Sequence, residues 1–205
     1  MLVRTTAINK IIKLKKRIKI IQGGTSAGKT FGILPILIHK AADTPNIEIS
    51  VVAESIPHLR RGALKDFLNI MKWTGRYFEQ RFNKSLLRYE FANGSYIEFF
   101  SADDSSKLRG ARRDILYINE CNNVDFNSYN ELAIRTKQEI YLDFNPANEF
   151  WVHTELKDES DSDFLILTYR DNEALDERIV KEIEKNRLKA NTSSYWENWW
   201  RVYGE

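Results

Sequence analysis

Short apolar runs alternate with amphipathic stretches along most of the chain. Runs that are continuous in apolar and β-branched residues predict strands over 17–22, 47–54, 115–120, 139–146 and 163–171. Helical periodicity predicts helices over 31–42, 57–72 and 126–136, and two more within 175–203. Because strands that alternate with helices form parallel sheets covered on both faces, the pattern predicts an α/β fold with a mainly parallel sheet between helices.

A hairpin is predicted between the second and third of these strands. The segments 86–91 and 96–100 flank Asn93-Gly94, a dipeptide that is typical of tight turns between antiparallel strands. We expect this hairpin to be an insertion beside the sheet.

Composition limits the class of protein. The 205 residues are 42% hydrophobic, enough for one substantial core, and the formal charge of +2 means that any DNA-binding surface must be local. A single cysteine, Cys121, excludes an intramolecular disulfide framework and a cysteine-rich zinc site. We expect the Cys121 side chain to be small, apolar and buried, in a protein of the reducing cytoplasm.

The basic run between Lys10 and Lys19 is not a signal peptide, because it lacks an uncharged apolar core. We predict a solvated face there, with a DNA contact as the alternative. No segment has the length of a membrane-spanning helix, and we expect no membrane partner.

The segment GGTSAGKT joins the first predicted strand to the first predicted helix. It matches the phosphate-binding pattern of a glycine, four residues and then Gly-Lys-Thr, in the strand-loop-helix context that the pattern requires. Its backbone amides and the helix N-terminus would face the phosphates, Lys29 would reach the β- and γ-phosphates, and the Thr30 hydroxyl would ligate Mg²⁺. The sequence therefore predicts that ATP and Mg²⁺ bind here, against the alternative of a plain glycine turn. The predicted phosphate-binding residues are Gly23, Gly24, Thr25, Ser26, Ala27, Gly28, Lys29 and Thr30.

The strand at 115–120 ends in a carboxylate. We assign Glu120 as the general base that polarises the attacking water, with an ordinary surface glutamate as the alternative. The residue before it, Asn119, stands where an aspartate would face the magnesium, so we predict a neutral second ligand and weaker metal affinity.

The strand at 139–146 ends in Asn145-Pro146. The Asn145 amide could sense the γ-phosphate, although Asn-Pro is also a common way to open a loop. Asp143 could be the missing acid, but its position within the strand favours a structural role at the edge of the core.

Hydrolysis also needs a cation for the transition state, and the segment KLRGARRD offers three arginines. We assign Arg109 as an arginine finger that acts in cis or from a neighbouring subunit. Arg112 and Arg113 could instead be solvated or contact DNA phosphates.

These motifs occur in a characteristic order over nearly the whole chain: GGTSAGKT, KLRGARRD, INECNN, ELAIRT, LDFNP, FWVHTELK, TYRDN and WWRVYGE. In this combination the chain resembles the ATPase domain of tailed-phage terminase large subunits. The resemblance implies a P-loop NTPase fold of the additional-strand, catalytic-glutamate type, with a core at 1–163 and a small lid subdomain with the start of a linker at 164–205.

The resemblance also implies a function and partners. An ATPase of this kind drives double-stranded DNA into a procapsid, as a homo-oligomeric, pentameric ring on a portal protein, with a small terminase subunit as a further partner. In isolation it could be a monomer. We expect it in the host cytoplasm, transiently docked on the viral procapsid.

Three features depart from the family pattern. Thr25 and Ser26 stand where many relatives carry an arginine, which favours Arg109 as the finger. Asn119 replaces the usual aspartate. The chain ends at Glu205, where relatives continue into a nuclease, so we expect no DNA cleavage by this chain. Two other functions remain open: another P-loop DNA motor, such as a helicase or a partitioning ATPase, and a nucleotide-binding assembly module with little turnover.

Overall fold

The computed structural model describes residues 3–104, 108, 110, 112–146 and 148–204, and within them the chain builds one eight-stranded sheet. The strands are β1 (Ile18–Gly23), β2 (Glu48–Ala53), β3 (Phe82–Asn83), β4 (Arg88–Glu90), β5 (Tyr96–Ser101), β6 (Arg113–Ile118), β7 (Thr136–Phe144) and β8 (Ser162–Leu167). Their order is β3-β4-β5-β2-β6-β7-β1-β8. The strands from β5 to β8 pair in parallel, and β3 and β4 add an antiparallel edge.

The position of β7 identifies the type of sheet. It pairs with both β1 and β6, so one strand separates the strand that leads into the glycine loop from the strand that precedes Glu120. This is the additional-strand arrangement that the family resemblance implied, and the predicted α/β fold with a mainly parallel sheet is confirmed.

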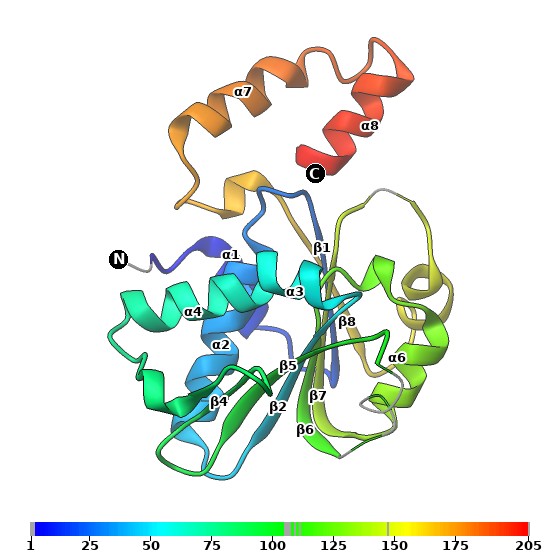
Figure 1. The fold of residues 1–205 in the computed structure, drawn as a ribbon. Coiled ribbons are helices and arrows are strands. Elements are labelled where there is room, and N and C mark those ends of the chain that lie inside the picture. Colours follow the sequence, from blue (N-terminus) through cyan, green and yellow to red (C-terminus); the bar gives the residue numbers. More distant parts are fainter. Residues whose placement is uncertain (1–2, 105–107, 109, 111, 147, 205) are drawn as a thin grey trace.

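Helices cover both faces of the sheet (Figure 1). The α-helices are α1 (Thr6–Ile12), α2 (Lys29–Asp43), α3 (Ile56–Arg61), α4 (Ala63–Trp73), α6 (Phe126–Ala133), α7 (Glu177–Arg187) and α8 (Ser194–Tyr203), of which α7 and α8 lie outside these layers. Short 3-10 turns occur at η1 (Glu79–Arg81), η2 (Cys121–Asn123) and η4 (Tyr169–Asp171), and η3 (Val152–Leu156) is a π-helical turn. The described part of the chain contains no helix with the length and apolarity needed to cross a bilayer.

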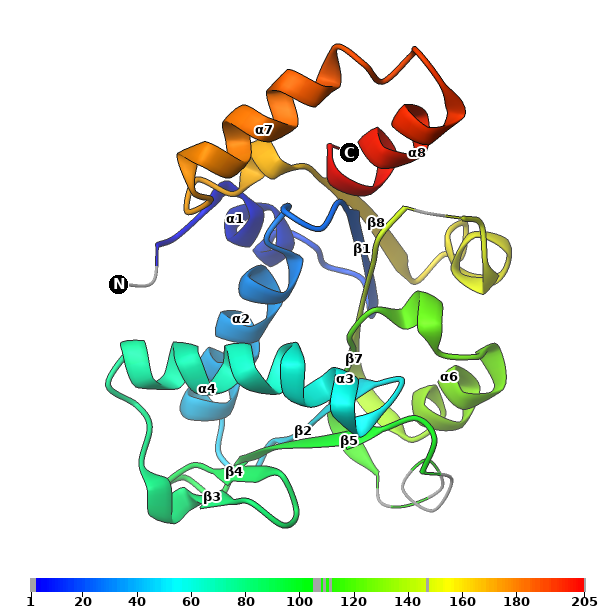
Figure 2. The same cartoon turned by 45° about the horizontal axis from the view of Figure 1, so that its top comes forward.

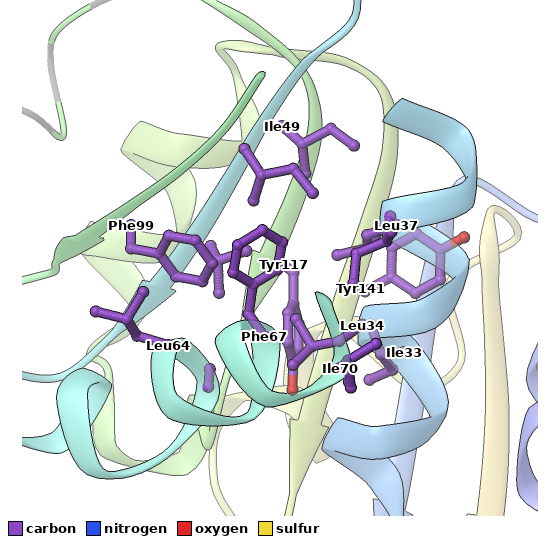
Figure 3. Close-up of a cluster of buried hydrophobic side chains, with 14 of the residues drawn as sticks. Ile33, Leu34, Leu37, Ile49, Leu64, Phe67, Ile70, Phe99, Tyr117 and Tyr141 are labelled. Carbon is purple, nitrogen blue, oxygen red and sulfur yellow. The ribbon is translucent and has the colours of Figure 1, made fainter. Parts of the chain in front are cut away.

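Alternation along the strands divides the core into two clusters. Ile115 and Tyr117 of β6 face α2 and α4, whereas Leu116 and Ile118 face α6, and all four side chains are buried. Figure 3 shows the first cluster, in which side chains from α2 and α4 gather around Tyr117. A strand buried on both faces accounts for the almost continuous apolar run at 115–118.

Three elements differ from the predictions. The hairpin forms around Gly94, but it is not an insertion, because β5 pairs with β2 over six residues and is an inner strand of the sheet. The helix predicted over 57–72 is two helices, α3 and α4, that meet at Gly62. The basic N-terminal segment contains α1, which buries Ala7 and Ile11 against α2 and was not predicted.

The helices α7 and α8 lie beyond the loop end of β1, away from the layers that cover the sheet (Figures 1 and 2). Within the described chain, α8 buries no residue and α7 buries only Ile183 and Asn186. The division of the chain at residues 163 and 164 stays a prediction. Since β8 crosses that position and pairs with β1, a separate lid formed by α7 and α8 would begin after Leu167.

Candidate active site

Parallel strands bring three predicted segments to one edge of the sheet. The glycine loop follows β1, Asn119 and Glu120 follow β6, and Asn145 follows β7. Because β7 pairs with both other strands, the ends of all three strands lie side by side. The glycine loop therefore shares one site with residues that lie more than 90 positions further along the sequence.

The loop from Gly23 to Gly28 needs glycine at both ends. At Gly23 a Cβ atom would lie 2.4 Å from the Leu167 carbonyl oxygen, so a side chain would clash with the neighbouring strand. Gly28 has a φ of 75°, in the left-handed region, and directly precedes α2. The curled loop places its backbone at the positively polarised N-terminus of a 15-residue helix.

The Lys29 side chain binds the backbone of the glycine loop. Its Nζ donates hydrogen bonds to the carbonyl oxygens of Gly23 (2.7 Å) and Gly24 (3.1 Å) and to Oδ1 of Asn145 (2.8 Å). Burial lowers the pKa of the ammonium group, and the nearby Asp143 and Glu120 carboxylates oppose that shift. A buried cation with only neutral hydrogen-bond acceptors is poised to gain from an anionic ligand.

Glu120 adopts a left-handed conformation (φ 53°, ψ 56°), which is uncommon for a residue with a side chain. Its Oε2 lies 3.1 Å from Nε2 of His58, on α3. The Nδ2 of Asn123 donates to the same oxygen at 3.4 Å. The carboxylate expected as general base is thus held by two side chains at the rim of the site.

A polar cluster centred on Asp143 lies beneath Glu120. Its Oδ1 accepts hydrogen bonds from the Tyr117 hydroxyl (2.9 Å), Nδ2 of Asn119 (3.0 Å) and the Glu120 backbone N–H (3.1 Å). Asp143 is 1% exposed and Asn119 3%. The Asn119 amide is therefore directed at the Asp143 carboxylate, and Asp143, expected at the edge of the core, belongs to the site itself.

A cleft of about 200 Å³ brings these groups together. Its described lining does not include Asn119; it is formed by Thr25, Gly28, Lys29, Thr30, Phe31, Asp66, Glu120, Asp143 and Asn145. Asp66, on α4, was not singled out from the sequence, because a lone acidic residue in an amphipathic helix carries no signal of its own. Burial raises the pKa of its carboxyl to about 6.

A second cleft, of about 400 Å³, adjoins the first at Gly28 and Phe31. Its walls are largely apolar and include Trp73, whose indole stacks on the Phe31 ring with centroids 6.1 Å apart and planes 17° apart. Ala174 and Leu175 also line this cleft. The two clefts together offer a polar compartment beside an apolar one.

The C-terminal region contacts the glycine loop twice. The Thr25 backbone N–H donates to the Val202 carbonyl at 2.9 Å. The Asn172 Nδ2 donates to the Ser26 carbonyl at 2.9 Å. The motif TYRDN therefore holds the loop, a function that its position in the sequence did not indicate.

The arginine segment is placed only in part. Arg109 lies outside the described residues. Arg113 begins β6 and is buried; its guanidinium donates to Ser50 Oγ (3.0 Å) and to the Leu132 carbonyl (3.1 Å). Neither a solvated role nor a DNA-phosphate contact holds for Arg113. It lies at the amino end of its strand, away from the cleft at the carboxyl ends.

Comparisons with known proteins agree with this fold. The family model for the phage terminase large subunit matches residues 15–203. No curated protein matches the chain. The large terminase of a thermophilic bacteriophage superposes with a TM-score of 0.77 at 17% identity, over 94% of this chain and 52% of the other.

Two further solved structures have the same fold. The ATPase domain of the Thermus phage P74-26 large terminase gives a TM-score of 0.64 at 13% identity, over 96% of this chain and 91% of the other. The HK97 bacteriophage large terminase gives 0.69 at 14% identity, over 97% and 48%. The chain spans about half the length of the thermophilic-bacteriophage and HK97 proteins. The thermophilic-bacteriophage terminase has also been solved with ADP and with ATP-gamma-S.

Proposed function

The chain belongs to the phage terminase large subunit family, and from that premise we propose that it hydrolyses ATP to drive double-stranded viral DNA into a procapsid. The observation that carries the proposal is the buried Lys29 ammonium, bound by two loop carbonyls in the same cleft as Glu120. A cation beneath a phosphate loop, facing a carboxylate at a strand end, provides both the binding and the chemistry of a hydrolytic motor.

ATP would occupy both clefts. The triphosphate fits the polar cleft, where Lys29 would exchange its carbonyl partners for phosphate oxygens. The adenosine would extend past Gly28 into the apolar cleft, where Trp73 and Phe31 offer aromatic surface to the base. The thermophilic-bacteriophage terminase, which shares the fold, binds ADP and ATP-gamma-S, which supports this choice of ligand.

Mg²⁺ is the proposed second cofactor. The ion prefers oxygen ligands and commonly binds through one or two carboxylates together with substrate phosphates. The cleft offers the Thr30 hydroxyl at the start of α2 and carboxylates on neighbouring elements, so its donor set fits the ion. Bound there, Mg²⁺ would offset negative charge on the phosphates.

Glu120 would accept a proton from the attacking water. The Asn145 side chain, which accepts a hydrogen bond from Lys29, would sense the γ-phosphate and link its hydrolysis to movement at the end of β7. Arg109 remains the proposed finger, in trans, because no arginine lies between Gly23 and Gly28. A mixture of Arg109→Ala and Lys29→Ala subunits should then recover activity that neither variant has alone.

The proposed partners are duplex DNA, a portal protein and a small terminase subunit. The chain would act as part of a pentameric ring on the procapsid in the host cytoplasm. The basis for these is family membership.

The test is phosphate release by this chain with duplex DNA, single-stranded DNA or none. We expect turnover that duplex DNA stimulates. Preferential stimulation by single strands would favour a helicase. ATP binding without phosphate release, even with duplex DNA and portal-bearing procapsids, would identify an assembly module.

A further inference from the structure

We propose that Asp143 supplies the carboxylate of the Mg²⁺ site, in place of the residue at position 119. This inference rests on the proposed ATPase function. Asp143 lies within β7, and from its position in the sequence we expected it to have a structural role.

The first argument is the cost of burying Asp143. A carboxylate that is 1% exposed is expensive unless hydrogen bonds and opposite charge offset its desolvation. Three donors meet Oδ1, and the Lys29 ammonium is close enough for the two groups to interact electrostatically. All hydrogen bonds to Asp143 found among the described residues end on Oδ1. Since Asp143 lines the cleft, Oδ2 is the oxygen that remains for a ligand there.

The second argument is the position of Thr30. The Tyr117 hydroxyl donates to Asp143, and the Thr30 side chain is close enough to the same phenol to act against the rise in its pKa. Asp143 and Thr30 thus flank one hydroxyl group and line the same cleft. A hydroxyl and a carboxylate, brought together beside a phosphate loop, are the oxygen ligands that Mg²⁺ takes from proteins.

The third argument excludes Asn119 as the charged ligand. A carboxylate oxygen only accepts hydrogen bonds, so the Asn119 atom 3.0 Å from Asp143 Oδ1 must be the amide nitrogen. The amide carries no net charge, and its N–H group holds the carboxylate. Asn119 is therefore a positioning residue for Asp143.

The other carboxylates of the cleft are weaker candidates. Glu120 is paired with His58 and stands at the rim. Asp66 lies on α4, and burial raises its pKa to about 6. Its carboxyl therefore loses its proton less readily than an ordinary aspartate to become a charged metal ligand. No group of three or more histidine, cysteine, aspartate or glutamate side chains suited to a metal occurs in the described chain. A site with one protein carboxylate, completed by phosphate and water, is the Mg²⁺ pattern that remains.

The test uses Mn²⁺ as a paramagnetic substitute for Mg²⁺. Free Mn²⁺ is measured by electron paramagnetic resonance while the metal is titrated into protein saturated with ADP. Asp143→Asn should weaken Mn²⁺ binding by about 10- to 100-fold, the range found when groups that support a metal site are removed. The substituted amide oxygen can still accept the three hydrogen bonds, so the fold should persist.

Asp66→Asn is the matched control, because it removes a carboxylate from the same cleft and should change Mn²⁺ affinity by less than about twofold. Without metal, ADP should bind both variants at least as tightly as the wild type, because each variant lacks a negative charge in the phosphate cleft. An Asp143→Asn protein that binds Mn²⁺ as tightly as the wild type would overturn the proposal, as would an equal loss in Asp66→Asn.

A second measurement does not depend on the Asp143→Asn variant. Wild-type protein carrying ¹³C-labelled aspartate, with Mn²⁺ and ADP bound, should show a ¹³C hyperfine coupling that persists in Asp66→Asn. The absence of any aspartate coupling would also contradict the proposal. If the wild type bound neither ADP nor Mn²⁺ with ADP, the proposed ATPase function itself would fail, which is a distinguishable result.

Discussion

The Nε2 of His58 lies 3.1 Å from Oε2 of Glu120, so a residue that follows β2 holds the carboxylate that follows β6. The pair fixes one oxygen of Glu120 while the side chain remains at the rim of the phosphate cleft. An oriented carboxylate beside the terminal phosphate is the arrangement that a general base requires.

Glu120→Gln should therefore lower the turnover number by about 100-fold or more, because the amide keeps the shape of the side chain and loses its basicity. ADP affinity, measured by calorimetry, should stay within about twofold. Glu54→Gln is the control, since Glu54 is an exposed glutamate just after β2. Unchanged turnover in Glu120→Gln would place the base elsewhere.

Lys29→Ala should abolish detectable ATP binding in calorimetry. The substitution removes the cation that the loop carbonyls and Asn145 hold beneath the phosphates. Lys19→Met serves as the control for the loss of a buried lysine, because Lys19 pairs with Glu139 in the interior of the fold. Retained affinity in Lys29→Ala would refute the phosphate-loop assignment.

Trp73→Ala tests the apolar cleft as the site of the base. Loss of an aromatic face should weaken ADP binding by about 10-fold, whereas inorganic triphosphate, which has no base, should bind as before. Phe78→Ala removes an exposed aromatic side chain that lines neither cleft and should have no effect. Equal losses for ADP and triphosphate would argue against base stacking at Trp73.

Asp66 should make stability depend on pH in the unliganded protein. Burial raises its folded-state pKa from 3.8 to about 6, so on raising the pH the unfolded chain loses this proton first. The contribution of Asp66 to the free energy of unfolding therefore falls between about pH 4 and pH 6 and is constant above. The full shift would correspond to about 3 kcal/mol. For a partly exposed carboxyl we expect about 1 kcal/mol after solvent screening.

Asp66→Asn should accordingly raise the free energy of unfolding at pH 7.5 and leave it nearly unchanged at pH 4. Urea titrations at the two pH values measure the difference. A gain of equal size at both values would mean that ionisation of Asp66 is not its cause.

The parts of the fold that the sequence revealed are those with a local signal. Continuous apolar runs predicted the buried parallel strands, and Asn93-Gly94 correctly predicted a turn. The turn could not show which strand β5 would pair with, because the pairing with β2 joins residues about 48 positions apart. The helix α1 was not predicted, because it lies in a lysine-rich segment and its buried face has few residues.

The same distinction applies to the site. The phosphate loop and Glu120 belong to motifs with fixed spacing, so their chemistry could be proposed before their geometry was known. His58, Asp66 and Asn172 come from separate elements. They reach Glu120, the phosphate cleft and the glycine loop, respectively, only because of the strand order and helix packing. Asp143 was noticed, but its strand position could not reveal three donors converging on one oxygen.

The hydrogen bond from the Thr25 N–H to the Val202 carbonyl is a latch between the loop and the C-terminal helix. A backbone N–H has a single hydrogen, so while Val202 holds it, that hydrogen is not free for a phosphate oxygen. A nucleotide that accepts a hydrogen bond from the Thr25 N–H must displace the Val202 carbonyl, and that carbonyl must oppose the nucleotide to the same extent, because thermodynamic linkage is reciprocal. The fold thus couples occupancy of one small loop to a contact of a helix residue about 177 positions further along the chain.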